Sequence, residues 1–215
     1  MNLTVVVETL PYLLRGTVST VAIAAAVVVL GTAAGVVLGL LRFVPWTWLE
    51  TVVAWVVELV RAVPLLLLIF FIFFGLPALN IRIPTFPAAV LAMSLWMAVN
   101  TSEVVRGGIK SIPRGQFEAA RSTGLTGLQT MRYVIFPQAV RRMIPPFVGL
   151  CTILVKDTSL AAIIGVFELT RAAQETIERT LRSFEIYLVT AAIYFAICFP
   201  LTRFAQKAEA RLHRP

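Results

Sequence analysis

Residues 115–137 read GQFEAARSTGLTGLQTMRYVIFP, a short polar segment with helix-forming residues that separates two long apolar stretches. The wider segment from Arg106 to Arg142 carries seven lysines and arginines. An otherwise apolar chain has little reason to hold such a basic segment unless the segment meets another molecule in water. The identity of that molecule decides how the rest of the chain is interpreted.

The composition around this segment is that of a polytopic membrane protein. Of the 215 residues, 59% are hydrophobic and 14% are charged, and the mean hydropathy is +0.87. A soluble domain has about 45–50% apolar and about 25% charged residues. The net charge of +8 does not call for a nucleic-acid partner, because the basic residues flank apolar spans as membrane topology requires. We therefore expect an all-α membrane protein.

Five apolar stretches are long enough to cross a bilayer, which takes about 20 residues. The predicted spans are residues 16–41, 51–79, 84–104, 143–166 and 185–204, with the loop 106–142 between the third and the fourth. Glu58, Arg61 and Pro64 interrupt the second span. We expect these spans to form a single transmembrane domain over residues 1–215.

The lysines and arginines are distributed unequally between the two sides of these spans. One side holds Arg42, Arg106, Lys110, Arg114, Arg121, Arg132, Arg141, Arg142, Arg203, Lys207, Arg211 and Arg214, and the other holds Arg15, Arg82, Arg171, Arg179 and Arg182. Because basic loops stay in the cytoplasm, we expect the N-terminus outside and the C-terminus and the loop 106–142 inside. Residues 167–183 mix acidic and basic side chains and predict an amphipathic helix on the outer face.

The first half of the loop predicts a short helix with one small-residue face. Phe117, Ala120 and Gly124 fall on one side of such a helix, and Ala119 beside them keeps it slim. Glu118 is placed to pair with Arg121 or to accept hydrogen bonds at the turn. A face of small residues would let a groove of another protein approach closely. A connector helix lying on the membrane surface explains the same residues, so both interpretations stay open.

The second half of the loop predicts another short helix. Thr126 and Gln129 have the spacing of a capping box for a helix over residues 127–136. Pro137 is expected to end that helix.

Charged side chains inside the predicted spans form a second group. Lys156 and Asp157 would cost about 5–7 kcal/mol if both faced lipid near the bilayer centre. Because they point about 100° apart on a helix, each needs a partner elsewhere. The candidate partners are Glu58, Arg61, Glu103 and Arg106. These charges are either structural ion pairs between helices or the lining of a polar path through the membrane.

A polar run, Asn100-Thr101-Ser102-Glu103, lies in the third span. Threonine and serine hydroxyls in membrane helices often bond to the preceding turn. A free Glu103 carboxylate would favour a cationic solute, whereas a carboxylate held by Arg106 would not. In the first span, Gly31, Gly35 and Gly39 share one face and predict close helix packing, either within one subunit or between two.

Several kinds of chemistry are not expected. Cys151 and Cys198 lie in apolar segments and are interpreted as buried free thiols. His213, in the tail, is the only histidine, so we expect neither a metal site nor a catalytic group. The sequence contains no GxxxxGK[ST] phosphate-binding loop. We therefore expect that this chain is not an enzyme and binds no nucleotide itself.

The segment Glu118-Ala119-Ala120, then Gly124, then residues 135–137 (IFP), resembles the EAA loop of permease subunits in bacterial ATP-binding-cassette importers. Other stretches resemble the polar amino acid branch of that family, the histidine- and glutamine-type permeases. They are residues 15–17 (RGT) with Thr20, 61–65 (RAVPL), 74–77 (FGLP), 103–108 (EVVRGG), 112–113 (IP), 115–116 (GQ), 137–139 (PQA), 156–160 (KDTSL) and 165–169 (GVFEL). The resemblance covers nearly the whole chain in order. It departs at Asn100, where the family more often has tyrosine.

The resemblance implies a type I importer permease in the bacterial inner membrane that moves polar amino acids by alternating access. Two permeases, identical or related, would form the pore. Two cytoplasmic ATPase subunits would bind ATP and Mg²⁺, and an extracytoplasmic binding protein would deliver the amino acid. No cofactor is expected in this chain.

Site residues follow from the same resemblance. Motion of the ATPases would enter through a coupling helix at about 115–124. The expected coupling residues are Gln116, Phe117, Glu118, Ala119, Ala120, Gly124 and Pro137. The candidates for the substrate path are Glu58, Arg61, Asn100, Thr101, Ser102, Glu103, Lys156, Asp157, Thr158 and Ser159. The alternative function is an ion-coupled secondary transporter or a channel. Five spans do not form the paired inverted halves of many such proteins.

Overall fold

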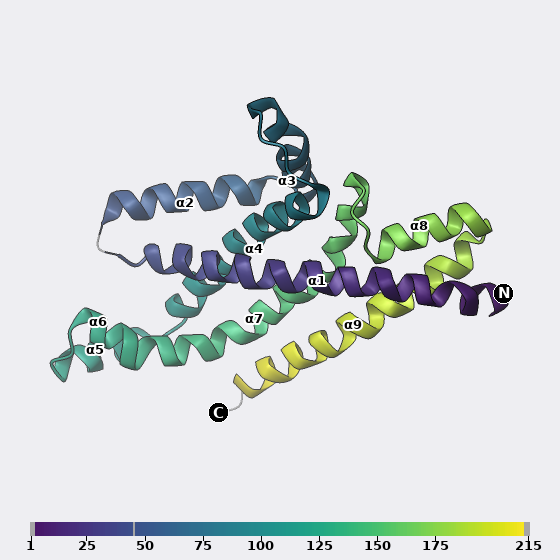
Figure 1. Ribbon diagram of the computed structural model, residues 1–215. Helices are drawn as coiled ribbons and strands as arrows, with labels where there is room; N and C mark the ends of the chain where they lie inside the picture. The colour runs from purple at the N-terminus through teal and green to yellow at the C-terminus, as the bar shows by residue number, and fades with distance from the viewer. Residues whose placement is uncertain (1–2, 45, 213–215) are drawn as a thin grey trace.

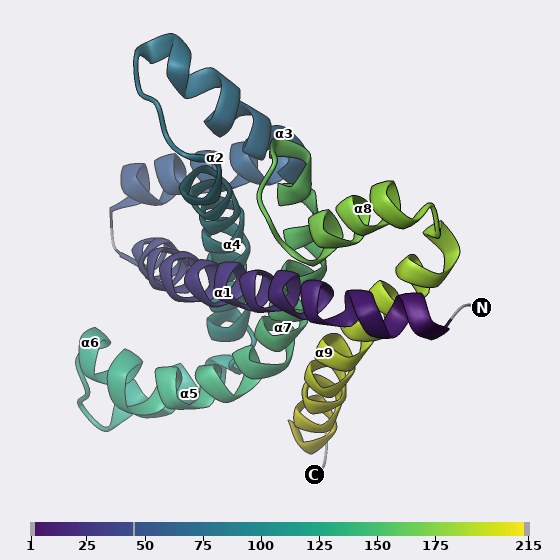
Figure 2. The ribbon, with the colours of Figure 1, turned by 45° about the vertical axis from the view of Figure 1, so that its right-hand side comes forward.

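The computed structural model describes residues 3–44 and 46–212, and every regular element in these ranges is helical. His213 and Arg214 lie outside the described residues. Helix α1 (Leu3–Leu41) runs along the whole molecule beside α2 (Thr47–Ala62), α4 (Thr85–Lys110), α7 (Phe136–Asp157) and α9 (Ser183–Leu212), as Figure 1 shows. The short helices α5 (Arg114–Ser122) and α6 (Gly127–Gln129) lie at one end of the bundle, and α8 (Leu169–Thr180) lies at the other, beside the N-terminus (Figure 2).

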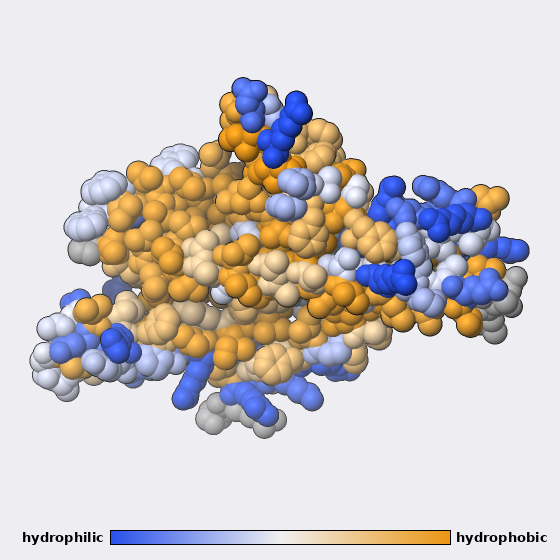
Figure 3. Space-filling model, viewed as in Figure 1, coloured by the Kyte–Doolittle hydropathy of each residue, from blue (hydrophilic) through white to orange (hydrophobic). Residues whose placement is uncertain are grey.

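Within the described residues, four helical stretches are long and apolar enough to cross a membrane. They are Val5–Leu41, Thr85–Lys110, Gly127–Ile164 and Ser183–Leu212. Their surface forms a broad hydrophobic zone between hydrophilic ends (Figure 3). Large apolar side chains such as Val18, Val29 and Phe195 are exposed there. A bilayer is the environment in which such a surface is stable.

The second predicted span, residues 51–79, is sharply bent rather than straight. Helix α2 ends at Ala62, and the chain resumes as α3 (Leu65–Phe70), a π-helical turn at Phe71–Gly75 and a 3₁₀ turn at Leu76–Leu79. The two halves meet at 99°. Pro64 explains the break, because it disfavours helical backbone at the preceding residue, and Val63 is extended, with φ −88° and ψ 128°.

The close packing predicted for the first span takes place within the chain, between α1 and α4. A Cβ built on Gly31 would lie 2.6 Å from Met97 Cβ, one on Gly35 would lie 2.5 Å from the Ala98 carbonyl oxygen, and one on Gly39 would lie 2.7 Å from Val105 Cβ. Glycine is therefore required where the two helices cross. This contact fixes the position of α4, which carries the polar run at residues 100–103.

The prediction that Pro137 ends a helix over 127–136 is wrong. After α6, a π-helical segment at Thr130–Ile135 leads directly into α7. The Phe136 amide donates to the Met131 carbonyl, five residues back. This wider turn accommodates the ring of Pro137, which would clash with the fourth preceding carbonyl in a regular α-helix. At the far end of α7, the α-helix stops at Asp157 and a 3₁₀ segment occupies Thr158–Ile164.

Candidate functional site

Helix α5, at one end of the bundle, is closed by a glycine turn. Gly124 has a φ of +81°. Its amide donates to the Arg121 carbonyl at 3.0 Å, and the Leu125 amide donates to the Ala120 carbonyl at 3.3 Å. This pair of bonds is the Schellman arrangement, which glycine adopts without steric cost. Gly124 therefore lies beyond the end of the helix and reverses the chain direction. A Cβ built there has nothing within 4 Å, so close packing plays no part.

The predicted capping box at the start of α6 is confirmed. The Gln129 amide donates to Thr126 Oγ1 at 3.4 Å, and the Thr126 amide donates to Gln129 Oε1 at 2.9 Å. This reciprocal pair fixes the turn between α5 and the start of the π-helical segment.

The side of α5 that holds Phe117 and Ala120 faces the chain itself rather than water. Ala120 is only 5% exposed. Phe117 is half-buried and packs against a cluster of buried residues from α4, α7 and the segments next to them, Val105, Ile109, Ile112, Ile135, Ala139 and Met143. The small residue at 120 therefore lets α5 approach its own chain. The side of α5 that faces water carries Gln116, Glu118 and Ala119 instead.

Two polar contacts join the α5 region to α7. Gln138 Nε2 donates to Gln116 Oε1 at 3.0 Å and to the Val134 carbonyl at 2.8 Å. Arg142 Nη1 donates to the Ser111 carbonyl at 2.6 Å, which satisfies a free carbonyl at the end of α4. Together with the buried cluster, these contacts make α5 and the first part of α7 one packed unit.

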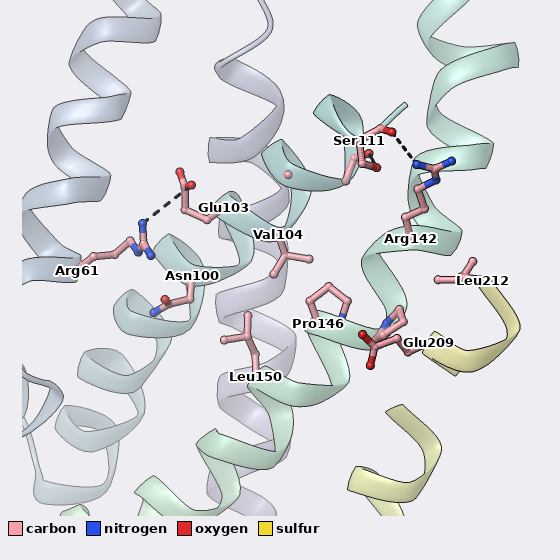
Figure 4. Close-up of a pocket in the computed structure, with 13 residues that line it drawn as sticks. Arg61, Asn100, Glu103, Val104, Ser111, Arg142, Pro146, Leu150, Glu209 and Leu212 are labelled. Carbon is pink, nitrogen blue, oxygen red and sulfur yellow. Dashed lines mark hydrogen bonds and ion pairs between the residues drawn. The ribbon is translucent and has the colours of Figure 1, made fainter. Parts of the chain in front are cut away.

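A cavity of about 760 Å³ lies between α2, α4, α7 and α9. Figure 4 shows Arg61, Asn100 and Glu103 on one side of it and Arg142, Glu209 and Leu212 on the other. The remaining lining comes from Val104, Gly107, Gly108, Ser111, Pro145, Pro146 and Leu150. The cavity lies in the half of the bundle that contains the ends of α4 and α9 and the start of α7.

Glu103, in the wall of this cavity, is surrounded by arginines. Arg106 Nε donates to both of its carboxylate oxygens, at 3.1 and 3.0 Å, and Arg42 Nη1 also contacts it. Arg61 Nη1 lies 3.9 Å from Glu103 Oε2 and 3.5 Å from Glu58 Oε1. The Glu103 side chain is 14% exposed, whereas that of Arg61 is 37% exposed. The carboxylate is therefore held by its neighbours, and the cavity wall offers a guanidinium and the Asn100 amide.

Three of the predicted path residues, Arg61, Asn100 and Glu103, line this cavity. Thr101 and Ser102 are buried, and the Ser102 hydroxyl bonds back to the Val99 carbonyl at 2.7 Å, as the general rule for membrane helices predicts. Glu58 lines a separate shallow groove on α2.

Lys156, Asp157, Thr158 and Ser159 do not line the cavity of Glu103. The hydroxyls of Thr158 and Ser159 bond back to the carbonyls of Val155 and Lys156. The prediction that Lys156 and Asp157 pair with Glu58, Arg61, Glu103 or Arg106 is wrong for the part of the chain that the structure describes. Those four residues pair with one another and with Arg42, because they all lie near the C-terminal half of α4, away from the end of α7.

At the opposite end of the bundle, Glu168 is completely buried and ties α8 to α1 and α9. Its carboxylate accepts hydrogen bonds from the Arg171 amide at 2.6 Å, from the Tyr194 hydroxyl at 3.0 Å and from the Thr20 hydroxyl at 3.4 Å. Burial raises the pKa of this carboxyl, although the hydrogen bonds oppose the shift. The expected amphipathic helix at 167–183 is confirmed as α8, and Glu168 is its N-cap.

Arg42, Arg142 and Glu168 have structural partners that sequence reasoning missed. The two arginines were used only as markers of topology. Arg42 follows the end of the first predicted span, and Glu103 lies near the end of the third. Their similar depth in the membrane was therefore a signal from which their ion pair could have been predicted. No comparable signal in the sequence indicates Glu168, since its partners lie on three separate helices.

The sequence matches the family model for the inner membrane component of binding-protein-dependent transport systems over residues 31–214. It is 39% identical over 207 residues to the probable glutamine ABC transporter permease protein GlnP of Bacillus subtilis (strain 168), with 95% of each chain covered. It is 43% identical over 171 residues to the L-cystine transport system permease protein TcyB of the same organism, covering 79% of this chain and 72% of that protein.

Two solved structures are also similar. A crystal structure of an amino acid ABC transporter with histidines has a TM-score of 0.93 and 30% identity, covering 98% of this chain and 99% of that chain. An inward-facing structure of the MetNI methionine ABC transporter has a TM-score of 0.73 at 20% identity, covering 94% and 98%. At 20% identity, the similarity to the methionine transporter shows the fold alone.

Proposed function

Because this chain belongs to the family of inner membrane components of binding-protein-dependent transport systems, we infer that it is the permease subunit of an ATP-driven importer of polar amino acids. The observation that carries this conclusion is the 39% identity with a glutamine permease along 95% of both chains. An ion-coupled transporter or a channel would leave the water-facing helix α5 and its turn without a role.

In this proposal, five spans cross the inner membrane, and α2 together with α3 counts as one of them. The N-terminus and α8 face outward, where a binding protein delivers the amino acid. Helix α5 and the C-terminus face the cytoplasm. A second permease, identical or related, completes the pore, and two ATPase subunits that bind ATP and Mg²⁺ dock on the two α5 helices. The basic residues between Arg106 and Arg142 support this orientation.

Helix α5 is the coupling helix in this scheme, and its exposed Gln116, Glu118 and Ala119 are the side chains that meet the ATPase. Phe117, Ala120 and the Gly124 turn act from the inner side, by seating α5 on its own chain. When the ATPases close, α5 moves, and the Gln116–Gln138 and Arg142–Ser111 contacts carry that motion into α7. Pro145 and Pro146 of α7 line the cavity, so the motion changes the shape of the cavity directly.

The cavity favours an amino acid with an uncharged polar side chain. Arg61 and Arg142 line the cavity and can meet a substrate carboxylate. The Asn100 amide donates one hydrogen bond to the Trp96 carbonyl and can offer its other hydrogen and its oxygen to the substrate. Glu103 is held by Arg42 and Arg106, so it offers little to a cationic side chain. Glutamine has the required chemistry, and relatives that carry its name share 39% identity with this chain.

The decisive experiment is uptake into proteoliposomes that contain this chain with its co-encoded ATPase, supplied with the co-encoded binding protein. We expect uptake of radiolabelled glutamine that requires ATP inside the reconstituted system and is unaffected by collapse of the ion gradients. Arginine, cystine and histidine serve as competitors that define the range of substrates. Uptake driven by an ion gradient without ATP would contradict the importer assignment and favour a secondary transporter.

A further inference from the structure

A basic pocket of about 440 Å³ lies between the start of α7 and the end of α9. Arg141 and Ile144, three residues apart, line it from α7. Phe204, Lys207, Ala208 and Arg211 line it from α9, at the i, i+3, i+4 and i+7 positions of one helical face. Two antiparallel helices therefore each present a basic side chain next to an apolar one. In Figure 3, hydrophilic side chains gather beside hydrophobic ones near the end of α9.

The three cations of this pocket are exposed, and no ion pair formed by the described residues involves them. This distinguishes them from Arg42, Arg61 and Arg106, which gather around Glu103. The apolar part of the wall is exposed as well, with Phe204 at 57%, Ile144 at 39% and Leu212 at 39%. The pocket thus combines unneutralised positive charge with uncovered apolar surface.

A second cavity, of about 210 Å³, adjoins this pocket at Ile144. Its lining is nearly all apolar and comes from α1, α4 and α7, with Phe136, Val140 and Phe147 among the contributors. Along α7 the cavity extends from Phe136 to Phe147, on both sides of Arg141 and Ile144, so the basic pocket has an apolar cavity beside it. A charged pocket beside an apolar cavity matches the two parts of a phospholipid, its headgroup and its acyl chain.

We propose that Arg141, Lys207 and Arg211 bind the phosphate headgroup of an anionic phospholipid of the cytoplasmic leaflet, with an acyl chain against Ile144 and the adjoining cavity. The proposal rests on the orientation given under the proposed function. Charge complementarity carries it, because three unpaired cations next to apolar surface match an anionic lipid and repel a cationic partner. Such a lipid would join α7 to α9 on the side away from the cavity of Glu103.

Native mass spectrometry of the purified full-length chain in mild detergent tests this proposal. The chain is titrated with phosphatidylglycerol and, separately, with phosphatidylcholine of the same acyl chains. We expect tighter binding of phosphatidylglycerol. Each basic residue near an anionic lipid is worth about fivefold in affinity, so the Arg141→Gln/Lys207→Gln/Arg211→Gln variant should lose the preference by tenfold or more.

A matched control removes the same charge from another part of the cytoplasmic side, in the variant Lys110→Gln/Arg121→Gln/Arg132→Gln. This control should keep the preference for phosphatidylglycerol. Equal binding of the two lipids by the unchanged chain, or equal losses in the two variants, would overturn the proposal. Glycerol phosphate that bound as tightly as phosphatidylglycerol would also overturn it, because the acyl chain would then contribute nothing.

A second copy of the chain is the competing occupant of the pocket. Ala208→Cys, in a background with Cys151 and Cys198 changed to serine, reports on it by disulfide cross-linking in membranes. We expect no cross-linked dimer through this position, and an efficient cross-link would overturn the lipid assignment. ATP-driven uptake, measured alongside lipid preference, separates the two proposals. If the unchanged chain drives uptake with ATP but shows no lipid preference, the lipid site is wrong and the transport function stands. If the unchanged chain prefers phosphatidylglycerol but drives no uptake with ATP, the transport function is wrong and the lipid site stands.

Discussion

Gln138 Nε2 donates a hydrogen bond to Gln116 Oε1 at 3.0 Å, and this contact joins α5 to α7. We predict that Gln138→Ala uncouples the importer, because α5 then moves with less effect on α7. The complex should still assemble, and ATP should still be hydrolysed, but the amount of amino acid imported per ATP should fall several-fold. Paired measurements of uptake and phosphate release in the same proteoliposomes give this ratio.

Gln174→Ala is the matched control for this variant. It removes the same side chain from α8, at the opposite end of the molecule, where the structure records no hydrogen bond for it. The ratio of uptake to hydrolysis should stay unchanged in the control. An unchanged ratio in Gln138→Ala as well would show that the glutamine pair does not transmit motion.

Gly124 supplies the left-handed turn after α5, and the second prediction concerns its backbone conformation. A left-handed conformation costs an ordinary residue about 1–2 kcal/mol, and asparagine tolerates it better than alanine does. Because a Cβ at this position meets nothing within 4 Å, conformation alone should decide the result. We expect recovery of the ATPase in pull-downs, and uptake, to decrease in the order wild type, Gly124→Asn, Gly124→Ala. An alanine variant equal to wild type would contradict this explanation.

Gly35 is required by close packing between α1 and α4, which leads to the third prediction. Its Cβ in Gly35→Ala would lie 2.5 Å from the Ala98 carbonyl oxygen, and the helices must separate to admit it. Overpacking of this kind costs about 1–3 kcal/mol. We expect a lower thermal unfolding temperature in detergent. Gly149→Ala, a helical position with nothing within 4 Å of its Cβ, should leave the temperature unchanged or raise it.

The sequence was sufficient for the features that depend on local spacing. The capping box at Thr126 and Gln129 follows from two residues three apart, and α8 follows from its alternating charges. The apolar spans follow from the length needed to cross a bilayer. Each of these features depends on residues that are neighbours along one helix. A single segment of the sequence therefore contains all the information needed to predict it.

The sequence was not sufficient where the outcome depends on which helices become neighbours. The face of α5 that carries Phe117 and Ala120 could equally suit a partner protein or the chain itself, and only the position of α7 decides between them. The partners of Glu103 were likewise undetermined, because Arg42 is separated from it by an entire hairpin of helices. The passage of Pro137 through a continuous helix depends on a π-turn that no spacing rule indicates.

Glu168 gives the fourth prediction, which concerns pH. Burial raises the pKa of its carboxyl in the folded chain, so the folded state binds a proton more tightly than the unfolded state does. This contribution to stability is fully present below the ordinary carboxyl pKa and is lost as pH rises through the raised value. We expect the unfolding temperature of the wild type to fall across that window. Glu168→Gln, which cannot ionise, should remove this part of the pH dependence.

Glu175 serves as the control because its shift has the opposite sign. The hydrogen bond from the Tyr12 hydroxyl lowers the pKa of the Glu175 carboxyl, and Arg171 acts in the same direction. Its contribution is present above the ordinary carboxyl pKa and is lost as pH falls through the lowered value. Glu175→Gln should therefore reduce the loss of stability in acid. Identical pH profiles for the two glutamine variants would refute both assignments.

Arg61 gives the fifth prediction, which concerns the substrate. Because Arg61 lines the cavity and its side chain is 37% exposed, Arg61→Gln should lower the maximal uptake rate of glutamine by about tenfold or more, as expected for loss of a hydrogen bond to a charged group worth about 1.5–3 kcal/mol. The binding protein should still bind glutamine normally. Glu50→Gln, on the same helix but in a different groove, should transport at nearly the wild-type rate.

Glu103→Gln separates a structural role of this carboxylate from a role in substrate selection. The Arg42 side chain is 10% exposed, and removing the partner of a buried charge costs about 3–5 kcal/mol. We therefore expect a low yield of folded protein and no new preference between arginine and glutamine in the fraction that folds. A well-folded Glu103→Gln protein that loses arginine uptake and keeps glutamine uptake would show that Glu103 faces the substrate. The cavity would then select substrates with a positively charged side chain. In that case Arg61 would receive the substrate carboxylate only when Glu103 is present to balance the charge of Arg61.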